Sequence, residues 1–404
     1  MTRTLLELLA VPSVTGSAAE SELQHLLARH LEKLDLNVDL WSMDLPTLRA
    51  EPAYPGAEAP RNEAWGLVGS TKESEEGPTL ILQGHADVVP PGDLTQWAGD
   101  PFVPRVSGDV VHGRGACDMK AGLAAVLGAL AAIRASGVKP RGRLSAHFVV
   151  SEEDGGLGAF GTLWRGHTGD ACIIAEPTGG MLMTANAGAL TFRLEVPGQA
   201  AHGGTRYAGV SALDAYVPLH RALARLEAAR NANPHTLMAA YPIPYPLSVG
   251  KVHAGDWASS VPDLLVAEGR LGVRLDEDPA EARTELENCI AQACADHSWL
   301  RNNPARVTWP GGQFASGRLP DGHPLAALVG RAHADVAGGR PPKGQGAPYG
   351  SDLRLYGAEG IPTLQYGPGE VRWAHGPQEH VGIAEVMTVT RTLVVTALRA
   401  VGTR

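Results

Sequence analysis

The 404-residue chain lacks the features that mark several classes of protein. Its formal net charge is −9, and it has no basic run or aromatic-basic stripe, so we expect no nucleic-acid partner. No apolar run is long enough to cross a membrane, and the opening MTRTLLELLAVPSVTG lacks the long apolar stretch and cleavage site of a signal peptide. We therefore expect a cytoplasmic protein with no membrane partner.

Cysteine is scarce as well. The four cysteines form no CxxC pattern, which favours buried free thiols over disulfides; they are Cys117, Cys172, Cys289 and Cys294. What the chain does contain, 44% hydrophobic and 19% charged residues, is typical of a globular protein. A chain of this length predicts two domains.

Two patterns of predicted elements divide the chain. Residues 1–187 alternate strands and helices and predict an α/β domain with a mostly parallel sheet and helices on both faces. Residues 188–311 read as strand, helix, strand, strand, helix, strand, which predicts an inserted α+β domain of ferredoxin-like type. The α/β alternation resumes over 312–404, which we assign to the second part of the first domain. The Pro- and Ala-rich stretch 46–60 is predicted to be a surface loop.

Acidic and imidazole residues recur in short motifs, several of them directly after a predicted strand. Ligands of open α/β sheets bind at the carboxyl ends of strands. Two imidazoles with three or four carboxylates are the ligand mixture that zinc prefers, and a pair of metals sharing one carboxylate would use it economically. The motifs are His85 in GHADVV, Asp118 in GRGACDMK, Glu152 and Glu153 in SEEDGG, Glu176 in AEPTG, and His375 in WAHGPQEH.

The order of these motifs resembles a known superfamily along essentially the whole chain. Together with a W-x-x-D-P-F stretch, AHGG, and GSDLR, it is similar to the dinuclear zinc amidohydrolases and exopeptidases that include acetylornithine deacetylase, succinyl-diaminopimelate desuccinylase, aminoacylase and bacterial glutamate carboxypeptidase. The resemblance implies two divalent metal ions per chain, zinc with cobalt or manganese as substitutes. It also implies a homodimer formed through the inserted domain, which would act as a lid.

The resemblance assigns the metal ligands one by one. Asp118 would bridge the two ions and precede a cis peptide bond; Asp87 would hydrogen-bond the second ring nitrogen of His85 and fix its tautomer. Read alone, HAD could be a surface turn and Asp118 an N-cap. His380 is a rival to His375, which fits the family pattern AHxPxE better. The implied ligands are His85, Asp118, Glu153, Glu176 and His375.

Two further residues acquire catalytic roles from the resemblance. Glu152 would be the general base, taking a proton from water and giving it to the leaving amine; the alternative is that Glu152 belongs to a charged turn. His202, in the inserted domain, would reach the partner subunit's site and stabilise the oxyanion. Its alternative is to cap a Gly-rich turn.

Substrate contacts are the least specific part of the resemblance. Arg274 and Arg354 match positions where relatives place arginines that hold a substrate carboxylate, although either could form a structural salt bridge. Relatives often carry Asn in a lid segment where this chain has Ser259 in ASSVPD, so their substrate contacts do not transfer directly.

The resulting hypothesis is hydrolysis of an amide bond in an N-acyl amino acid. The alternatives are a metallo-carboxypeptidase or dipeptidase acting on a dipeptide, and a non-catalytic relative that binds metabolites. A phosphohydrolase would also use two metals, but no Gly-rich phosphate loop or basic cluster accompanies the motifs.

Overall fold

The computed structural model describes residues 1–71 and 77–403. The chain folds into two compact units, each built from segments that are not contiguous in sequence. The first consists of Met1–Ala185, Arg318–Gln345 and Ser351–Arg404, and the second of Asn186–Gly317 and Gly346–Gly350. Two short strands, β14 (Gly317–Arg318) and β15 (Gly344–Ala347), lie where the sequence passes from one unit to the other.

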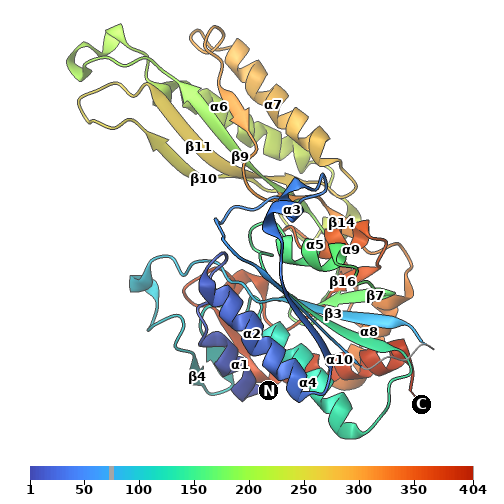
Figure 1. The fold of residues 1–404 in the computed structure, drawn as a ribbon. Coiled ribbons are helices and arrows are strands. Elements are labelled where there is room, and N and C mark those ends of the chain that lie inside the picture. The colour runs from blue at the N-terminus through green and yellow to red at the C-terminus, as the bar shows by residue number, and fades with distance from the viewer. Residues whose placement is uncertain (72–76, 404) are drawn as a thin grey trace. The chain divides into compact units, whose positions relative to one another are not determined.

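A mixed sheet with a parallel centre forms the middle of the first unit (Figure 1). Strands β6, β3, β7 and β16 run parallel to one another, whereas β1, β2 and β8 pair with antiparallel neighbours. β3 and β6 are buried along almost their whole length, as expected of strands covered on both faces. The strand order is β1 (Asn37–Ser42), β2 (Trp65–Ser70), β6 (Arg143–Val149), β3 (Thr79–His85), β7 (Ala171–Ile174), β16 (Thr363–Gln365), β8 (Leu182–Asn186) and β14, with β15 also paired to β8.

Helices cover both faces of this sheet because its strands alternate their apolar side chains. Leu80 and Leu82 of β3 belong to the larger core with α1 (Thr2–Leu9), α2 (Ala18–Lys33), α4 (Lys120–Ser136), α8 (Pro324–Ala337) and α10 (Ile383–Val401). Ile81, between them, packs on the other face with α5 (Leu157–Trp164) and α9 (Leu353–Ala358). No helix among the described residues is long and apolar enough to cross a bilayer.

A small antiparallel sheet accompanies the central one in the first unit. Its strand order is β17 (His380–Gly382), β5 (Val110–His112) and β4 (Arg105–Ser107). Val111 and Val381 are directly paired and point into the main core. Two 3-10 turns, η1 (Leu94–Gln96) and η4 (Val371–Trp373), precede parts of this sheet in the sequence.

The second unit is an antiparallel sheet with helices packed on it. Along β9 buried and half-buried residues alternate strictly, so one face carries the core that α6 and α7 cover. Its elements run β9 (Gly188–Pro197), η2 (Gly203–Ala208), α6 (Ala212–Arg230), η3 (Thr236–Met238), β10 (Leu247–Ala254), β11 (Leu264–Val273), α7 (Pro279–Ala295), β12 (Arg306–Thr308) and β13 (Gln313–Phe314). The order β10, β11, β9, β12 is that of a ferredoxin-like βαββαβ fold.

The predicted fold class is confirmed, with one local correction. Residues 46–60 were expected to form a surface loop, but α3 (Leu45–Ala50) occupies the start of that stretch. The Asp44 carboxylate accepts a hydrogen bond from the amide of Thr47, and Pro46 stands in the first turn, where its missing N–H costs nothing. Leu45 and Leu48 are buried, so local capping and burial outweigh the proline-rich composition.

Gly122, in the first turn of α4, allows close contact between that helix and the end of β7. A Cβ at residue 122 would lie 2.1 Å from the carbonyl oxygen of Ala175. We predict that Gly122→Ala lowers the free energy of unfolding by about 1–3 kcal/mol through this overlap, despite the better helix propensity of alanine. Denaturant unfolding measures the change.

The matched control is Gly357→Ala in α9, where a Cβ meets nothing within 4 Å. There the helix propensity should act alone and raise stability by up to about 1 kcal/mol. Equal effects at residues 122 and 357 would contradict the packing argument.

Candidate metal centre

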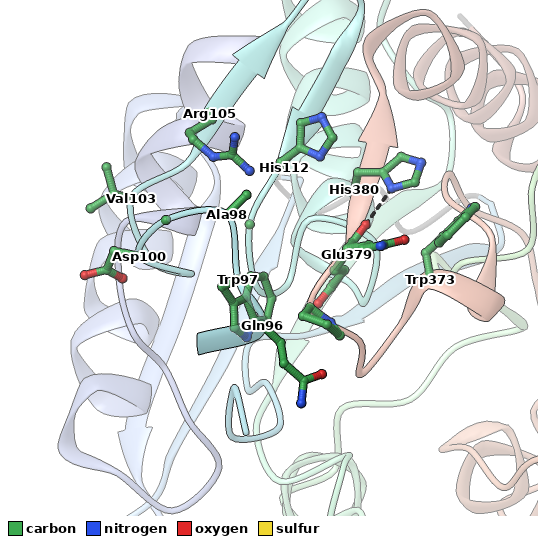
Figure 2. A pocket seen from close by; sticks show the side chains of 14 residues that line it. Gln96, Trp97, Ala98, Asp100, Val103, Arg105, His112, Trp373, Glu379 and His380 are labelled. Carbon is green, nitrogen blue, oxygen red and sulfur yellow. Dashed lines mark hydrogen bonds between the residues drawn. The ribbon is translucent and has the colours of Figure 1, made fainter. Parts of the chain in front are cut away.

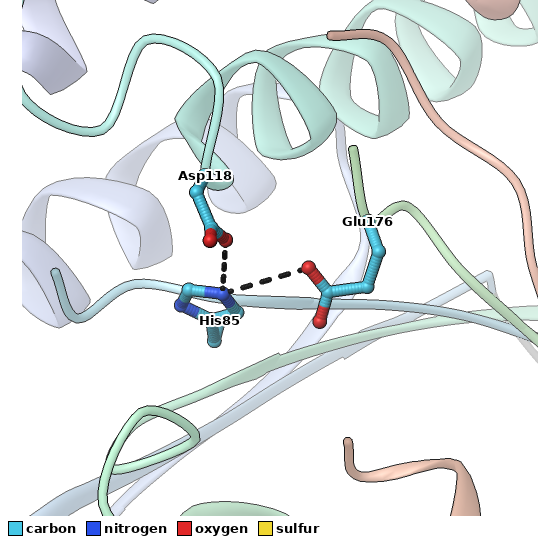
Figure 3. A group of neighbouring side chains, drawn as sticks. All are labelled: His85, Asp118 and Glu176. Carbon is cyan, nitrogen blue, oxygen red and sulfur yellow. Dashed lines mark hydrogen bonds and ion pairs between the residues drawn. The ribbon is translucent and has the colours of Figure 1, made fainter. Parts of the chain in front are cut away.

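His85 stands at the end of β3, in the middle of the central sheet, and is 1% exposed. Its Nε2 lies 3.1 Å from Asp118 Oδ1 and 3.7 Å from Glu176 Oε2 (Figure 3). Its Nδ1 lies 2.9 Å from the backbone carbonyl of Asp87. The carbonyl thus holds the ring so that Nε2 faces the two carboxylates.

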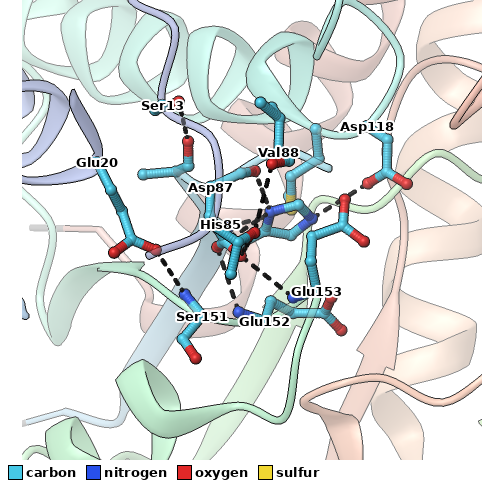
Figure 4. A network of polar contacts seen from close by, with 12 residues as sticks. Ser13, Glu20, His85, Asp87, Val88, Asp118, Ser151, Glu152 and Glu153 are labelled. Carbon is cyan, nitrogen blue, oxygen red and sulfur yellow. Dashed lines mark hydrogen bonds and ion pairs between the residues drawn. The ribbon is translucent and has the colours of Figure 1, made fainter. Parts of the chain in front are cut away.

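Asp87 makes the predicted hydrogen bond to the second ring nitrogen of His85, through its backbone carbonyl. The Asp87 carboxylate lies 3.6 Å from His85 Nδ1, beyond hydrogen-bond distance. Its oxygens instead accept from the amides of Glu152 and Glu153, each at 3.2 Å, and from the hydroxyl of Thr15 at 3.0 Å. Asp87 therefore holds the ring with its carbonyl and the Glu152–Glu153 segment with its side chain (Figure 4).

A second group of potential ligands shares Asp118 with the first. His375 Nε2 lies 3.1 Å from Glu153 Oε2 and 3.5 Å from Asp118 Oδ2. The structure thus contains two clusters, His85–Asp118–Glu176 and Asp118–Glu153–His375, with all potential ligand atoms of each within 4.8 Å of one another. The peptide bond after Asp118 is cis, as the resemblance implies. His380 is in neither cluster; its Nδ1 lies 2.7 Å from the carbonyl of Gln378.

The chemistry of these clusters suits divalent cations. Oε1 of Glu153 and Oε1 of Glu176 are buried and have no hydrogen-bond partner among the described residues. Burial raises the pKa of both carboxyls, and the charge of Asp118 acts in the same direction. Desolvation opposes protonation of His375, yet the Glu153 and Asp118 carboxylates raise its pKa to about 11. Carboxylate and imidazole ligands in this number match zinc, and a bound cation would satisfy the unpartnered oxygens.

Glu152 lies beside the clusters without belonging to either. It is 7% exposed, and its amide is held by Asp87. Burial raises the pKa of its carboxyl well above the usual value, and the charge of Glu176 acts in the same direction. A buried carboxyl of this kind next to potential metal ligands has the properties of a proton carrier.

The segment that carries Glu152 and Glu153 is fixed by a buried ion-pair network. Arg61 binds Glu20 at 2.8 Å and Asp154 at 3.3 Å, and all three side chains are almost fully buried. Glu20 of α2 also accepts from the amide of Ser151 at 3.2 Å. Sequence reasoning missed Glu20 and Arg61, because no local pattern links Glu20 with Ser151, 131 positions away, or Arg61 with Asp154, 93 positions away.

A second buried ion pair, Glu379 with Arg114, fixes the backbone at Asp118. Glu379 Oε1 accepts from the amides of Cys117 at 3.0 Å and Asp118 at 3.1 Å, and its other oxygen pairs with Arg114. Both Glu379 and Arg114 are 1% exposed. Glu379 was recognised only as part of the motif around His375. Its position in AHGPQE, four residues after a ligand, was the one available signal.

The remaining predicted site residues lie outside the clusters. Arg354 is buried and donates to the carbonyls of Ser351 at 2.7 Å and Gly155 at 2.6 Å. In the second unit, His202 Nδ1 accepts from the amide of Gly204 at 3.1 Å, and the carbonyl of Ser259 accepts from Gly203 at 2.6 Å. Arg274 is paired with Glu277 at 3.4 Å and Glu285 at 3.7 Å.

Fold and site together define an α/β metalloprotein with an α+β insertion and a carboxylate-rich centre at the ends of parallel strands. The sequence model of peptidase family M20/M25/M40 matches residues 81–399, and the chain belongs to this family. It is accordingly a metal-dependent amidohydrolase that acts on C–N bonds.

Curated relatives agree with this assignment, and a solved structure agrees with the fold. The chain is 27% identical over 399 residues to N-formyl-4-amino-5-aminomethyl-2-methylpyrimidine deformylase of Bacillus subtilis (strain 168), covering 92% of this chain and 87% of that protein. It is 31% identical over 322 residues to succinyl-diaminopimelate desuccinylase of Leptothrix cholodnii, covering 76% and 77%. The fold matches the M20 metallo-carboxypeptidase Sso-CP2 of Sulfolobus solfataricus with a TM-score of 0.78 at 14% identity, covering 98% of each chain.

The Glu379–Arg114 pair yields a prediction about stability and metal affinity. Glu379→Ala leaves a buried guanidinium and two amides without their acceptor, so we expect unfolding to become easier by about 3–5 kcal/mol. We also expect weaker binding of zinc, because the amide of Asp118 is no longer held. Denaturant unfolding and zinc titration calorimetry measure the two effects.

Glu379→Gln separates them. The amide oxygen of Gln can still accept from Cys117 and Asp118, while the charge that pairs with Arg114 is lost. This variant should lose stability but keep zinc affinity closer to that of the wild type than Glu379→Ala does. Equal zinc affinity in wild type and both variants would rule out a role for Glu379 in positioning Asp118.

Proposed function

We propose that the protein removes the acyl group from an N-acyl amino acid by hydrolysing its amide bond. The observation that carries the proposal is the pair of clusters sharing Asp118, with the buried carboxyl of Glu152 beside them. A pair of ligand sets and a separate proton carrier are what metal-assisted hydrolysis of an amide requires.

We propose two divalent ions, with zinc as the native metal and cobalt or manganese as substitutes. His85 and Glu176 would hold one ion, Glu153 and His375 the other, and Asp118 both. When bound, such ions polarise a carbonyl and lower the pKa of water to about 7. The unpartnered oxygens of Glu153 and Glu176 support this assignment.

Glu152 is the proposed general base. Its carboxylate would take a proton from the attacking water and give it to the leaving nitrogen, so the same group serves both halves of the reaction. Burial raises the pKa of its carboxyl, which favours the protonated form that would give a proton to the leaving nitrogen, and so supports this role. Asp87, which accepts from the amide of Glu152, would hold the base in position.

The names of the relatives favour a deacylase over a peptidase. The Bacillus subtilis relative is named a deformylase and the Leptothrix cholodnii relative a desuccinylase, and each name denotes removal of an acyl group. A carboxypeptidase or dipeptidase is the second candidate, and the likeness to Sso-CP2 supports only the fold.

Arg274 and Ser259 are retained as proposed contacts of the substrate. Arg354 donates to two backbone carbonyls and is proposed to act by fixing the backbone at Gly155.

A substrate panel tests the proposal. N-acetyl, N-succinyl and N-formyl amino acids and a set of dipeptides are assayed after loading with zinc, cobalt or manganese. Release of the acyl group, with dipeptides left intact, is the expected result. Hydrolysis of dipeptides alone would establish the peptidase, and no turnover of any member with metal bound would contradict the proposal.

We also propose a cytoplasmic homodimer that forms through the second unit. Large apolar side chains are exposed on η2 and α6, with Tyr207 at 86% and Leu213 at 48%, and the edge strand β10 exposes Val252 at 52%. Exposed apolar groups beside an edge strand support an interface there. The four free thiols are in keeping with a reducing compartment.

Glu152→Gln should retain about two metal ions per chain and lose roughly 10²–10⁴-fold in turnover rate, because the ligands remain and the proton carrier does not. Elemental analysis and steady-state kinetics on the same preparation give both numbers. One ion or none in active enzyme would refute the dinuclear centre. Retained activity in the variant would assign the base to another residue.

His202 is proposed to act in the partner subunit's site, so His202→Ala should lower the turnover rate by roughly 10²–10³-fold with metal content unchanged. Mixing this variant with Glu152→Gln tests the trans arrangement. In a mixed dimer one site combines intact Glu152 with the partner's intact His202, so part of the activity should return. Mixed dimers as inactive as both parents, or a fully active monomer, would refute it.

A further inference from the structure

A pocket of about 420 Å³ opens beside the small sheet of the first unit (Figure 2). It is lined by residues of β4, β5 and β17, by the segment around Trp97, and by the segment from Trp373 to His380. None of its lining residues belongs to the two metal-ligand clusters. The size is within the range of pockets that hold small molecules.

Strand register places three nitrogen-bearing side chains in one row along this pocket. His112 of β5 pairs directly with Arg105 of β4 on one side and with His380 of β17 on the other. Directly paired residues of antiparallel strands project from the same face, with their Cβ atoms roughly 5 Å apart. Figure 2 shows Arg105, His112 and His380 gathered at one end of the pocket, and the two imidazole rings lie 5.5 Å apart.

Few acidic side chains in the pocket are free to pair with Arg105, His112 and His380. Of the lining residues, Glu379 and Asp100 are acidic. Glu379 is already paired with the buried Arg114, and Asp100 Oδ1 accepts from the amide of Phe102 at 2.8 Å. When the His112 ring is protonated it directly faces the Arg105 guanidinium on the adjacent strand, and a bound anion would offset the repulsion between these two charges.

Two tryptophans add apolar surface next to the row. The ring of Trp373 lies 4.7 Å from that of His380, and the indole of Trp97 donates to the carbonyl of Pro91 at 2.9 Å. Both residues line the pocket and are half-buried. A few convergent donors with aromatic walls are the usual composition of a site for a small organic molecule.

We propose that this pocket is a second ligand site, which binds the oxyanion of a small carboxylate or of a phosphate-type group through Arg105, His112 and His380. Guanidinium and imidazolium donors form short charge-assisted hydrogen bonds with such oxygens. Burial, followed by the charges of His380 and Arg105, lowers the pKa of His112 in the empty pocket. A bound anion would offset the charges of His380 and Arg105 and so favour the protonated His112 ring.

Fluorine NMR of protein labelled with 5-fluorotryptophan tests the site directly, because the reporters line the pocket and not the metal clusters. Acetate and sulfate are titrated separately into the metal-loaded enzyme, with chloride keeping the ionic strength constant. The resonances of Trp97 and Trp373, assigned by Trp→Phe substitutions, should shift in a saturable manner. Saturation by acetate identifies a carboxylate site, and saturation by sulfate identifies a site for tetrahedral anions.

Arg105→Gln/His112→Asn should raise the dissociation constant roughly tenfold or more, since neutral amides replace two of the three groups that can form charge-assisted hydrogen bonds. Arg29→Gln, which removes the same charge from an exposed position on α2, is the control and should leave binding unchanged. The single variant Arg105→Gln repeats the test if the double variant unfolds. No saturable shift with either anion, or equal binding by wild type and double variant, would overturn the proposal.

Discussion

Repulsion among buried carboxylates is the constraint on which the rest of the first unit depends. Asp118, Glu153 and Glu176 supply ligand atoms to clusters only a few ångströms across, with Glu152 beside them. Charges this close interact strongly in a protein interior, and the two clusters contain the imidazoles of His85 and His375 to offset part of the negative charge. The chain must therefore hold the carboxylates against their mutual repulsion until cations neutralise them.

The protein meets this requirement with carboxylates that bind the backbone instead of the metal. Asp87 accepts from the amides of Glu152 and Glu153, Glu379 from those of Cys117 and Asp118, and Glu20 from that of Ser151. Two of these three are themselves balanced by buried arginines. Rigid support of ligands by a second layer of hydrogen bonds is what keeps a metal site in its working geometry.

The sequence indicated the members of the two clusters better than the residues that support them, for a physical reason. His85, Glu153 and Glu176 end or follow apolar strands and Asp118 precedes a helix, so their local patterns are informative, whereas His375 lies in a loop and was indicated by its motif alone. Arg61 and Glu20 lie in unremarkable segments and acquire their role only through contacts between distant parts of the chain. The same limit applies to the strand Trp65–Ser70, whose two glycines weaken the strand pattern, and to the Asp87 carbonyl, because no sequence motif specifies which oxygen a ring nitrogen will meet.

The split composition of the first unit has a consequence during protein synthesis. Four of the five proposed ligands lie within the first 185 residues, whereas His375 and Glu379 follow the entire second unit. Chains emerge from the ribosome N-terminus first, so Arg114 and the carboxylates leave it well before the residues that complete their surroundings. Metal acquisition at the complete centre is therefore a step that follows translation, and a chain truncated before residue 375 carries a charged, half-built site that quality-control proteases can recognise as unfinished.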